Sequence, residues 1–468
     1  MEHKPVYVTQ EERQQQEAAI QAILHLPNRP QSFHIVTYGC QMNAHDSEKL
    51  AGLLLQMGML EADDRKHADL VLFNTCCVRD NAERRALGNV NWLKQLKKEK
   101  PKLLIGVCGC MVQQPLMAEK ILKQYKFIDL AFGTHNLHTL PQLLLTLLTE
   151  EKRVVSVTQC ENLIAEGLPV KRLNSYHAYI TIMYGCDNFC SYCIVPYVRG
   201  RERSRQASDI LREAEQLLRG GVQEIMLLGQ NVNSYGNGSE NGDTFPKLLK
   251  ALDEMGIPRI RFMTSHPKDL SDELIEVMAG GKHICNHLHL PIQSGNDEIL
   301  RLMNRRYTRE DYLRKVEKLR ASIPGIGLTT DFIVSFPGET EAQFGDTCSL
   351  VREVGFDSAF TFIYSPRAGT KAAAMQGMIE KEVTTQRFNR LVAEVEASAA
   401  KVYQNLLGKR EMVLVEGLSK RDEHMVAGKG ARNVTIVLPG DIQDVGKIIP
   451  VTITSAATNT LRAERLER

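Results

Sequence analysis

Three short apolar runs that each end in a cysteine constrain the fold of the N-terminal part of the chain most strongly. They are FHIVTYGC ending at Cys40, DLVLFNTC ending at Cys76 and KLLIGVCGC ending at Cys110. Each run stops at Gly or Asn-Thr and is followed by a polar, helix-like segment, which is typical of a buried strand in a parallel sheet. The runs recur about every 35 residues, the length of one strand–helix–strand unit. The sequence therefore predicts a parallel α/β sheet here.

The three cysteines stand where these strands end. Ligands in open α/β sheets gather outside the carboxyl ends of the strands, so we expect Cys40, Cys76 and Cys110 to meet at one point and form a three-thiolate site. A single cysteine is often only a small buried hydrophobe, but three at matching strand ends are hard to explain by packing. We interpret their neighbours Cys77 and Cys108 as packing or accessory groups.

A second group of cysteines has the spacing C-x3-C-x2-C. Cys186, Cys190 and Cys193 lie in the segment YGCDNFCSYCIVPYVRG. Four-iron cubanes are usually held by four cysteine thiolates, so three would leave one iron without a protein ligand and open to chemistry. A structural zinc loop is the alternative, but the sequence lacks a second C-x2-C pair at zinc-ribbon distance.

Composition favours a cytoplasmic enzyme that is not embedded in a membrane. The chain has 468 residues, of which 43% are hydrophobic, enough for a large core and two to four domains. Eleven cysteines and a start, MEHKPVYVTQ, without a signal-peptide pattern argue for thiolates and metal in a reducing compartment. The longest leucine-rich stretch, LPQLLLTLLTE, is shorter than the ~20 apolar residues of a spanning helix. A net charge of +2 does not by itself indicate a nucleic-acid partner.

The rest of the chain shows two further patterns. Strands and helices alternate between His177 and about Tyr403, which predicts parallel units in a partial (β/α)6 barrel with its active site at the carboxyl ends of the strands. The final stretch has short strands broken by Gly, Asp and Pro, which predicts a small antiparallel β-barrel. Residues 1–32 are expected to form a polar extension with one amphipathic helix, and residues 33–151 an α/β domain. Residues 172–403 are expected to form the barrel core, and residues 404–468 the small barrel.

Motifs along nearly the whole chain resemble the radical S-adenosylmethionine (SAM) methylthiotransferases, and among them the tRNA-2-methylthio-N6-dimethylallyladenosine synthase family (MiaB). Besides the C-x3-C-x2-C segment, the motifs are YGCQMN, NTC, GCMVQ, RGRERSR, LGQNVNSYG, HLPIQSGND, TDFIVSFPGET and YSPRAGTKAA. The resemblance implies that the α/β domain is a methylthiotransferase domain, the barrel a radical SAM core and the C-terminal barrel an RNA-binding TRAM domain. Local positive charge in that last domain comes from Lys409, Arg410, Lys420, Arg421, Lys429 and Arg432, with acids interleaved.

The resemblance also implies two [4Fe-4S] clusters and SAM. One cluster, held by Cys186, Cys190 and Cys193, would bind SAM at its open iron, and an auxiliary cluster would be held by Cys40, Cys76 and Cys110. SAM contacts are expected at Gly229, Gln230 and Asn231, although an ordinary turn is the alternative there. Loops around the adenosine are expected at Ser294-Gly295, at Asp331 and at Pro337-Gly338-Glu339. Arg205 and Arg367 could pair with the SAM carboxylate, whose geometry a guanidinium matches, or lie at the surface.

The implied reaction is methylthiolation of C2 of N6-isopentenyladenosine at position 37 of tRNA. That C–H bond is unactivated, so a SAM-derived 5'-deoxyadenosyl radical is needed to remove the hydrogen, and sulfur comes from the auxiliary cluster. Expected partners are the tRNA anticodon loop, a low-potential electron donor such as flavodoxin or ferredoxin, and a sulfur donor, with the enzyme a monomer. The alternatives are a methylthiotransferase acting on threonylcarbamoyl-adenosine in tRNA or on a ribosomal-protein aspartate, and a non-catalytic iron–sulfur RNA-binding protein.

Overall fold

The computed structural model describes residues 5–77, 80–114, 116–158, 162–238 and 241–466, so Cys160 lies outside the described part. The chain folds as two compact units. The first unit comprises Met1–Leu173, Met183–Asp187 and Cys193–Arg205, and the second comprises Asn174–Ile182, Asn188–Tyr192 and Gln206–Arg468. Among the described residues, no helix is both long and apolar enough to cross a membrane.

The first unit is built on a six-stranded parallel sheet, which confirms the predicted class. Its order is β3-β2-β4-β5-β6-β7. The three cysteine-ending runs form β2, β4 and β5, which are adjacent in the sheet. The strands are β2 (Ser32–Thr37), β3 (Leu60–Glu61), β4 (Leu70–Thr75), β5 (Leu104–Gly109), β6 (Leu130–Phe132) and β7 (Val154–Ser156).

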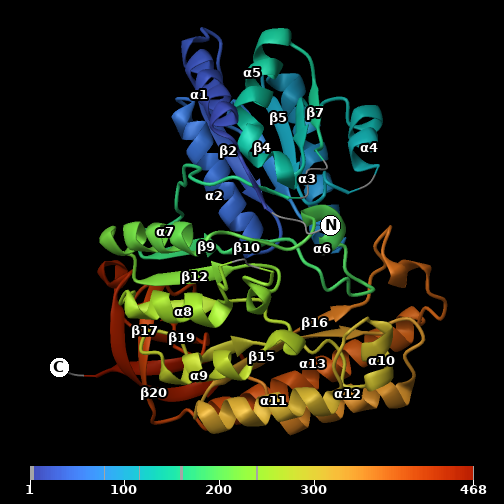
Figure 1. Cartoon of the computed structure of the whole chain (residues 1–468), viewed down its shortest axis with the longest axis vertical. Helices are drawn as coiled ribbons and strands as arrows, with labels where there is room; N and C mark the ends of the chain where they lie inside the picture. Colours follow the sequence, from blue (N-terminus) through green and yellow to red (C-terminus); the bar gives the residue numbers. More distant parts are fainter. Residues whose placement is uncertain (1–4, 78–79, 115, 159–161, 239–240, 467–468) are drawn as a thin grey trace. The chain divides into compact units, whose positions relative to one another are not determined.

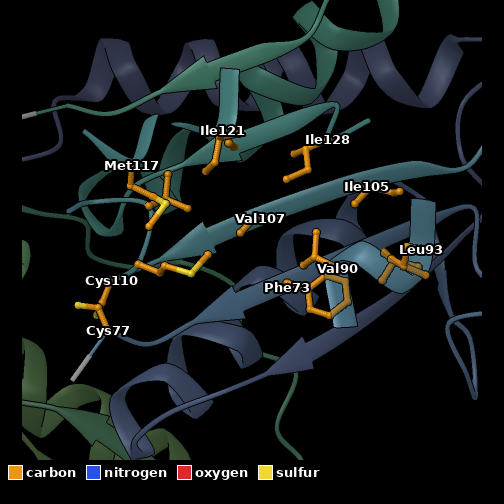
Figure 2. Packing of buried hydrophobic residues seen from close by; sticks show 14 of the residues in the cluster. Phe73, Cys77, Val90, Leu93, Ile105, Val107, Cys110, Met117, Ile121 and Ile128 are labelled. Carbon is orange, nitrogen blue, oxygen red and sulfur yellow. The ribbon is translucent and has the colours of Figure 1, made fainter. Parts of the chain in front are cut away.

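Helices cover both faces of this sheet (Figure 1). On one face, Ile23, Leu50 and Leu144 pack against Leu72 of β4; on the other, Val90, Ile121 and Val198 belong to the cluster around Phe73. Figure 2 shows part of the second cluster, with Cys77 and Cys110 at the end where β4 and β5 leave the sheet. The helices are α1 (Gln10–His25), α2 (Gln41–Gln56) and α5 (Leu140–Glu150) on the first face, and α3 (Asp80–Glu99), α4 (Met117–Gln124) and α6 (Val195–Arg199) on the second.

The amphipathic helix expected near the N-terminus is α1, and it packs as part of the first unit. It begins with a capping box, in which Glu12 N donates to Thr9 Oγ1 at 3.2 Å and Thr9 N donates to Glu12 Oε2 at 2.8 Å. Ile23 is completely buried in the core beneath the helix, and α1 runs alongside α5 (Figure 1). The other elements of this unit are β1 (Val6–Tyr7), β8 (Leu163–Ile164), β10 (Met183–Tyr184), β11 (Arg203–Ser204) and η1 (Thr134–Thr139).

The second unit begins with two three-stranded parallel sheets, β13-β12-β9 and β14-β15-β16. A parallel bridge between Ile260 and Ile284 links the first sheet to the segment that leads into β14, giving the expected six-stranded partial barrel. Its strands are β9 (His177–Thr181), β12 (Glu224–Leu228), β13 (Arg259–Phe262), β14 (His287–His289), β15 (Gly327–Val334) and β16 (Ser358–Ile363).

Helices and short 3-10 turns connect these strands, and Figure 1 shows α11, α12 and α13 along one side of the unit. The α-helices are α7 (Ala207–Arg219), α8 (Phe245–Glu254), α9 (Asp272–Gly280), α10 (Asp297–Leu302), α11 (Arg309–Ser322), α12 (Glu341–Val354) and α13 (Lys381–Gln404). The 3-10 turns are η2 (Val232–Ser234), η3 (Pro267–Asp269) and η4 (Lys371–Ala374).

The C-terminal strands close into a five-stranded barrel in the order β17-β18-β19-β21-β20. The strands are β17 (Arg410–Leu418), β18 (Met425–Lys429), β19 (Thr435–Pro439), β20 (Ile448–Ala457) and β21 (Thr460–Arg465), with η5 (Ile442–Asp444) between β19 and β20. Four of the pairings are antiparallel as expected, but β19 and β21 pair in parallel. This parallel pair closes the barrel, because the chain crosses over through β20 before β21 lies beside β19.

Buried ion pairs fix the small barrel to the partial barrel within the second unit. Glu224 of β12 accepts from Arg259 Nε at 2.9 Å and from Arg261 Nε at 2.7 Å, and both guanidinium groups donate to the carbonyl of Gly430. Arg432 pairs with the buried Asp357 at 2.7 Å. These charges are satisfied internally, so this side of the small barrel is a docking surface for the partial barrel.

Candidate iron–sulfur sites

The structure places the three N-terminal cysteines at neighbouring strand exits. Cys76 directly follows β4 and Cys110 directly follows β5, while Cys40 follows β2 and occupies the position immediately before α2. Cys76 and Cys110 are each only 2% exposed, whereas Cys40 is exposed to solvent. Cys77 and Cys108, by contrast, are buried among apolar side chains on opposite faces of the sheet, as expected of packing groups.

Asn43, in the first turn of α2, is the residue on which these strand ends converge. Its Oδ1 lies 3.7 Å from Cys40 Sγ and 3.9 Å from Cys110 Sγ. Its Nδ2 donates to the carbonyl of Thr75, the residue before Cys76, at 3.0 Å. Asn43 is completely buried, so this one amide connects all three strand ends. It belongs to the YGCQMN motif, but spacing alone gave it no role.

Two glycines allow the backbone to approach closely here. Gly39 has φ +125°, and a Cβ at this position would come within 2.6 Å of Cys76 Cβ and 3.1 Å of its Sγ. Gly109 has φ +93°, and a Cβ there would lie 2.5 Å from the carbonyl oxygen of Thr75. Both positions require glycine for conformation and for space. They bring Cys40 and Cys110 close to the end of β4.

Arg199, the last residue of α6, completes the surroundings of this site. Its guanidinium is buried and donates from Nε to Cys110 Sγ at 3.2 Å, and from Nη2 to Asn43 Oδ1 at 2.9 Å and Asp46 Oδ2 at 3.0 Å. Charge-assisted hydrogen bonds of this kind are stronger than neutral ones. Arg199 therefore holds Asn43 with its oxygen towards the thiols.

The donor set fits an iron–sulfur cluster. Burial raises the pKa of the Cys110 thiol to about 12 against the opposing effect of Arg199, so the free thiol is protonated and a poor nucleophile. Coordination to a metal removes that proton, and cysteine thiolates are the usual ligands of iron–sulfur clusters. Within the described part of the chain, no three His, Cys, Asp or Glu side chains lie close enough together to hold a single ion. A cubane, however, is larger than an ion and takes thiolates that stand farther apart.

A small cavity of about 50 Å³ borders the pair formed by Arg199 and Asp46. Its wall also includes Lys49, Arg203 and His135. Burial lowers the pKa of His135 to about 3, so this imidazole is neutral at physiological pH. The positive charge of the wall therefore comes from its lysine and arginines, with Asp46 as a counter-charge.

The second group of cysteines lies in the connection between β10 and α6. Cys186 N donates to the carbonyl of Gly200 at 3.1 Å within the first unit. Within the second unit, Arg305 is buried and its Nη1 lies 3.5 Å from Cys190 Sγ, while Ser191 N donates to the carbonyl of Met303 at 3.0 Å. Cys193 is partly exposed, two residues before α6. Each group of three cysteines thus has a buried guanidinium on one thiol.

The predicted SAM contacts are placed at or near strand ends of the partial barrel. Gly229, Gln230 and Asn231 follow β12, and Asn231 Oδ1 accepts from His266 N at 3.0 Å while its Nδ2 donates to Asp269 at 2.7 Å. Ser294 is buried after β14, with its Oγ 3.4 Å from Thr347 Oγ1. Asn231 and Ser294 therefore hold neighbouring loops in place.

The expectation that Asp331 lies in a loop is wrong. It lies inside β15, paired with Phe360 of β16, and its Oδ1 is 3.6 Å from His289 Nε2. The pattern TDFIVSFPG led to the error, because its polar Asp resembles a strand end, whereas the strand continues to Val334. Asp331 is therefore a side chain of the sheet, about one quarter exposed at 24%.

The two arginines expected at the SAM carboxylate differ in the contacts that they make. Arg205 belongs to the first unit and forms a buried bidentate pair with Glu166, with both N–O distances 2.6 Å. Arg367 belongs to the second unit and is half-buried, and its carbonyl accepts from Thr370 N at 3.0 Å and Oγ1 at 2.8 Å. The pairing of either guanidinium with SAM stays a prediction, and Arg205 would have to exchange Glu166 for it.

Comparison with protein-family models gives three matches. Residues 180–351 match the radical SAM superfamily, residues 32–133 match the uncharacterized protein family UPF0004, and residues 404–466 match the TRAM domain. The cysteine loop and strands β12 to β15 of the partial barrel lie in the first match, and Cys40, Cys76 and Cys110 lie in the second. The chain is thus a radical SAM enzyme with a C-terminal TRAM domain.

Curated relatives identify the family more closely. A tRNA-2-methylthio-N(6)-dimethylallyladenosine synthase from Caldicellulosiruptor saccharolyticus is 52% identical over 434 residues, 92% of each chain. A synthase of the same name from Acetivibrio thermocellus is 47% identical over 468 residues, 98% of each chain. The chain belongs to the tRNA-2-methylthio-N6-dimethylallyladenosine synthase family.

Solved structures support the fold alone. The radical S-adenosylmethionine methyltransferase TsrM from Kitasatospora setae, with tryptophan and a SAM analogue bound, matches with a TM-score of 0.53 at 15% identity. The match covers 73% of this chain and 75% of TsrM. At this identity the likeness carries no conclusion about substrate.

Proposed function

We propose that this enzyme methylthiolates C2 of N6-isopentenyladenosine at position 37 of tRNA and forms 2-methylthio-N6-isopentenyladenosine. The observation that carries the proposal is the identity of 47–52% to synthases of this name over nearly the whole chain. The radical SAM match supplies the reaction type, and the TRAM match agrees with an RNA substrate. The proposal includes a methylthiotransferase domain at residues 33–151 after a polar extension at 1–32, a radical SAM core at 172–403 and a TRAM domain at 404–468.

The reaction requires removal of a hydrogen from an unactivated carbon. Cys186, Cys190 and Cys193 would hold the cluster that binds SAM, and that SAM would supply the radical for this step. Cys40, Cys76 and Cys110 would hold an auxiliary cluster that supplies the sulfur, and a further SAM would supply the methyl group. The six cysteines release their protons and hold iron. Asn43 fixes the strand ends that carry the second group, and the burial of Cys76 and Cys110 keeps water away from their sulfurs.

The substrate base lies in a single-stranded anticodon loop, from which it can be turned out into a pocket at modest cost. The TRAM barrel is our candidate for contacts to the tRNA backbone. Of the six cations expected to contribute positive charge, Lys429 and Arg432 are engaged internally, Lys429 with Thr435 Oγ1 at 2.8 Å and Arg432 with Asp357. The other four of the six, Lys409, Arg410, Lys420 and Arg421, are exposed, and we assign them to phosphate contacts.

The proposal includes partners that supply electrons and sulfur. A low-potential donor such as flavodoxin or ferredoxin would reduce the SAM cluster, and a sulfur donor would rebuild the auxiliary site. We place the enzyme in the cytoplasm, a reducing compartment in which thiols are not oxidised to disulfides. We expect it to be a monomer.

The test is mass spectrometry of tRNA nucleosides from cells that lack this gene. We expect 2-methylthio-N6-isopentenyladenosine to disappear and N6-isopentenyladenosine to accumulate. Re-expression of the wild type or of Cys77→Ala should restore the product, whereas Cys76→Ala should not, since only Cys76 is assigned to iron. The substrate assignment is wrong if the product persists and another methylthio nucleoside disappears.

A further inference from the structure

Arg199 is a buried charge for which the reaction scheme has no use so far. It lies in the RGRERSR motif, shortly after the cysteines of the SAM cluster in the chain, yet its Nε contacts Cys110 Sγ of the other group at 3.2 Å. Its side chain is 6% exposed, and its ion-pair partner Asp46 is 12% exposed. One fixed positive charge and one fixed negative charge therefore lie within the same buried surroundings.

We propose that Arg199 sets the reduction potential of the auxiliary cluster, with Asp46 as an opposing charge. The inference rests on the proposed function, because it requires that Cys40, Cys76 and Cys110 hold a cluster. Arg199 is then a positioning and tuning residue whose guanidinium acts on the cluster through the sulfur of Cys110.

The physical reason is the charge added on reduction. A four-iron core with three thiolates is anionic, and one further electron makes it more so. A hydrogen bond to a ligand sulfur and a nearby buried cation both favour the reduced form, and these are established determinants of iron–sulfur potentials. Burial makes each effect larger than it would be in water. The carboxylate of Asp46 acts in the opposite direction.

A purely structural role for Arg199 makes a different prediction. Arg199 also holds Asn43 Oδ1 at 2.9 Å, so its loss could simply loosen the site. Loosening lowers the amount of cluster retained and gives no reason for Arg199 and Asp46 to act on the potential with opposite signs. The sign of the shift therefore separates electrostatic tuning from support.

The experiment uses the full chain with Cys186, Cys190 and Cys193 all changed to Ala, so that only the auxiliary cluster can form. After anaerobic reconstitution, the cluster is titrated with dithionite at controlled potentials and its reduced form is followed by electron paramagnetic resonance. We expect Arg199→Gln to lower the ratio of reduced to oxidised cluster at least tenfold at a fixed potential, a negative shift of about 59 mV for a one-electron couple. Asp46→Asn should shift the potential in the positive direction.

Two further variants sharpen the result. Arg199→Lys keeps the charge but cannot reach both Cys110 and Asp46 as a fork, so it should shift the potential less than Arg199→Gln. Arg153→Gln removes a guanidinium of the same unit that donates to the carbonyl of Ile128 at 2.7 Å, and it should leave the potential unchanged.

The possible outcomes are distinct. Opposite shifts for Arg199→Gln and Asp46→Asn support the proposal, and the Asp46→Asn shift alone decides it if Arg199→Gln does not fold. Unchanged potentials, or shifts of the same sign, overturn it while leaving the auxiliary cluster itself in place. If the triple cysteine variant binds no cluster at all, the auxiliary site fails, and this inference fails with it.

Discussion

Replacing Glu224 with Gln should release the C-terminal barrel from the partial barrel. Burial favours the neutral acid, but Arg261 and Arg259 outweigh it and lower the pKa of Glu224, so the carboxylate is charged in the folded protein. Glu224 is 2% exposed. The two guanidinium groups with which it pairs donate to the carbonyls of Lys429, Gly430 and other residues of the small barrel. Loss of the carboxylate removes the ion-pair partner of two buried guanidinium groups.

The expected cost follows from this burial. Removing one partner of a buried ion pair costs about 3–5 kcal/mol, and about 1.36 kcal/mol corresponds to a factor of ten. Local opening of the small barrel should therefore become roughly 10²- to 10⁴-fold more frequent in Glu224→Gln. Hydrogen–deuterium exchange of peptides from β17 and β18 measures this opening directly.

Glu215→Gln is the matched control. Glu215 pairs with Arg219 one helical turn away at 2.6 Å, but the side chains are 49% and 75% exposed, and such pairs contribute only about 0.3–0.5 kcal/mol. Hydrogen–deuterium exchange in β17 and β18 of Glu215→Gln should equal that of the wild type. If Glu224→Gln exchanges no faster than Glu215→Gln, the buried pairs do not hold the small barrel and the reasoning is refuted.

Three further outcomes are expected. Asn43→Leu leaves the carbonyl of Thr75 without its donor, at a cost of about 1–3 kcal/mol, and iron analysis should show a fall towards the content of one cluster; an unchanged iron content would contradict the role of Asn43. Gly295→Ala places a Cβ 2.6 Å from the carbonyl oxygen of Asp346, so its melting temperature should fall by an amount equivalent to about 1–3 kcal/mol, whereas Gly345→Ala, with nothing within 4 Å of its Cβ, should not be destabilised. Burial raises the pKa of Glu339 to about 7 from 4.5. The protonated acid stabilises the fold fully below pH 4.5, and this contribution is lost as the pH rises to about 7. In thermal unfolding, Glu339→Gln should therefore gain stability relative to wild type over this pH range, and parallel pH profiles of the two proteins would refute the raised pKa.

The sequence was sufficient to predict the parallel sheet and the cysteines at the ends of its strands. Periodicity and spacing are local signals, so β2, β4 and β5 with their terminal cysteines could be predicted, and adjacency of the strands follows from parallel topology. Arg199 could not be predicted as a neighbour of Cys110, because the two are 89 residues apart and only tertiary packing joins them. Asn43 lies in the YGCQMN motif, but a polar residue in the first turn of a helix usually faces water.

Errors and gaps arose where a side chain's role depends on its partner. Asp331 looked like a loop residue because it is polar, yet it lies inside β15 beside His289. The pairing of Arg205 with the SAM carboxylate stays a prediction, and the carboxylate that Arg205 contacts in the structure is Glu166. Parallel pairing of β19 with β21 was missed because short strands joined by turns favour antiparallel neighbours.

The most direct test of the central claim is a count of clusters by iron analysis and Mössbauer spectroscopy. Reconstituted wild-type protein should bind about eight irons in two [4Fe-4S] clusters. Changing Cys40, Cys76 and Cys110 to Ala should leave about four, and so should changing Cys186, Cys190 and Cys193 to Ala. A wild-type protein with only one cluster, or a triple variant that keeps both, would contradict two separate three-cysteine sites.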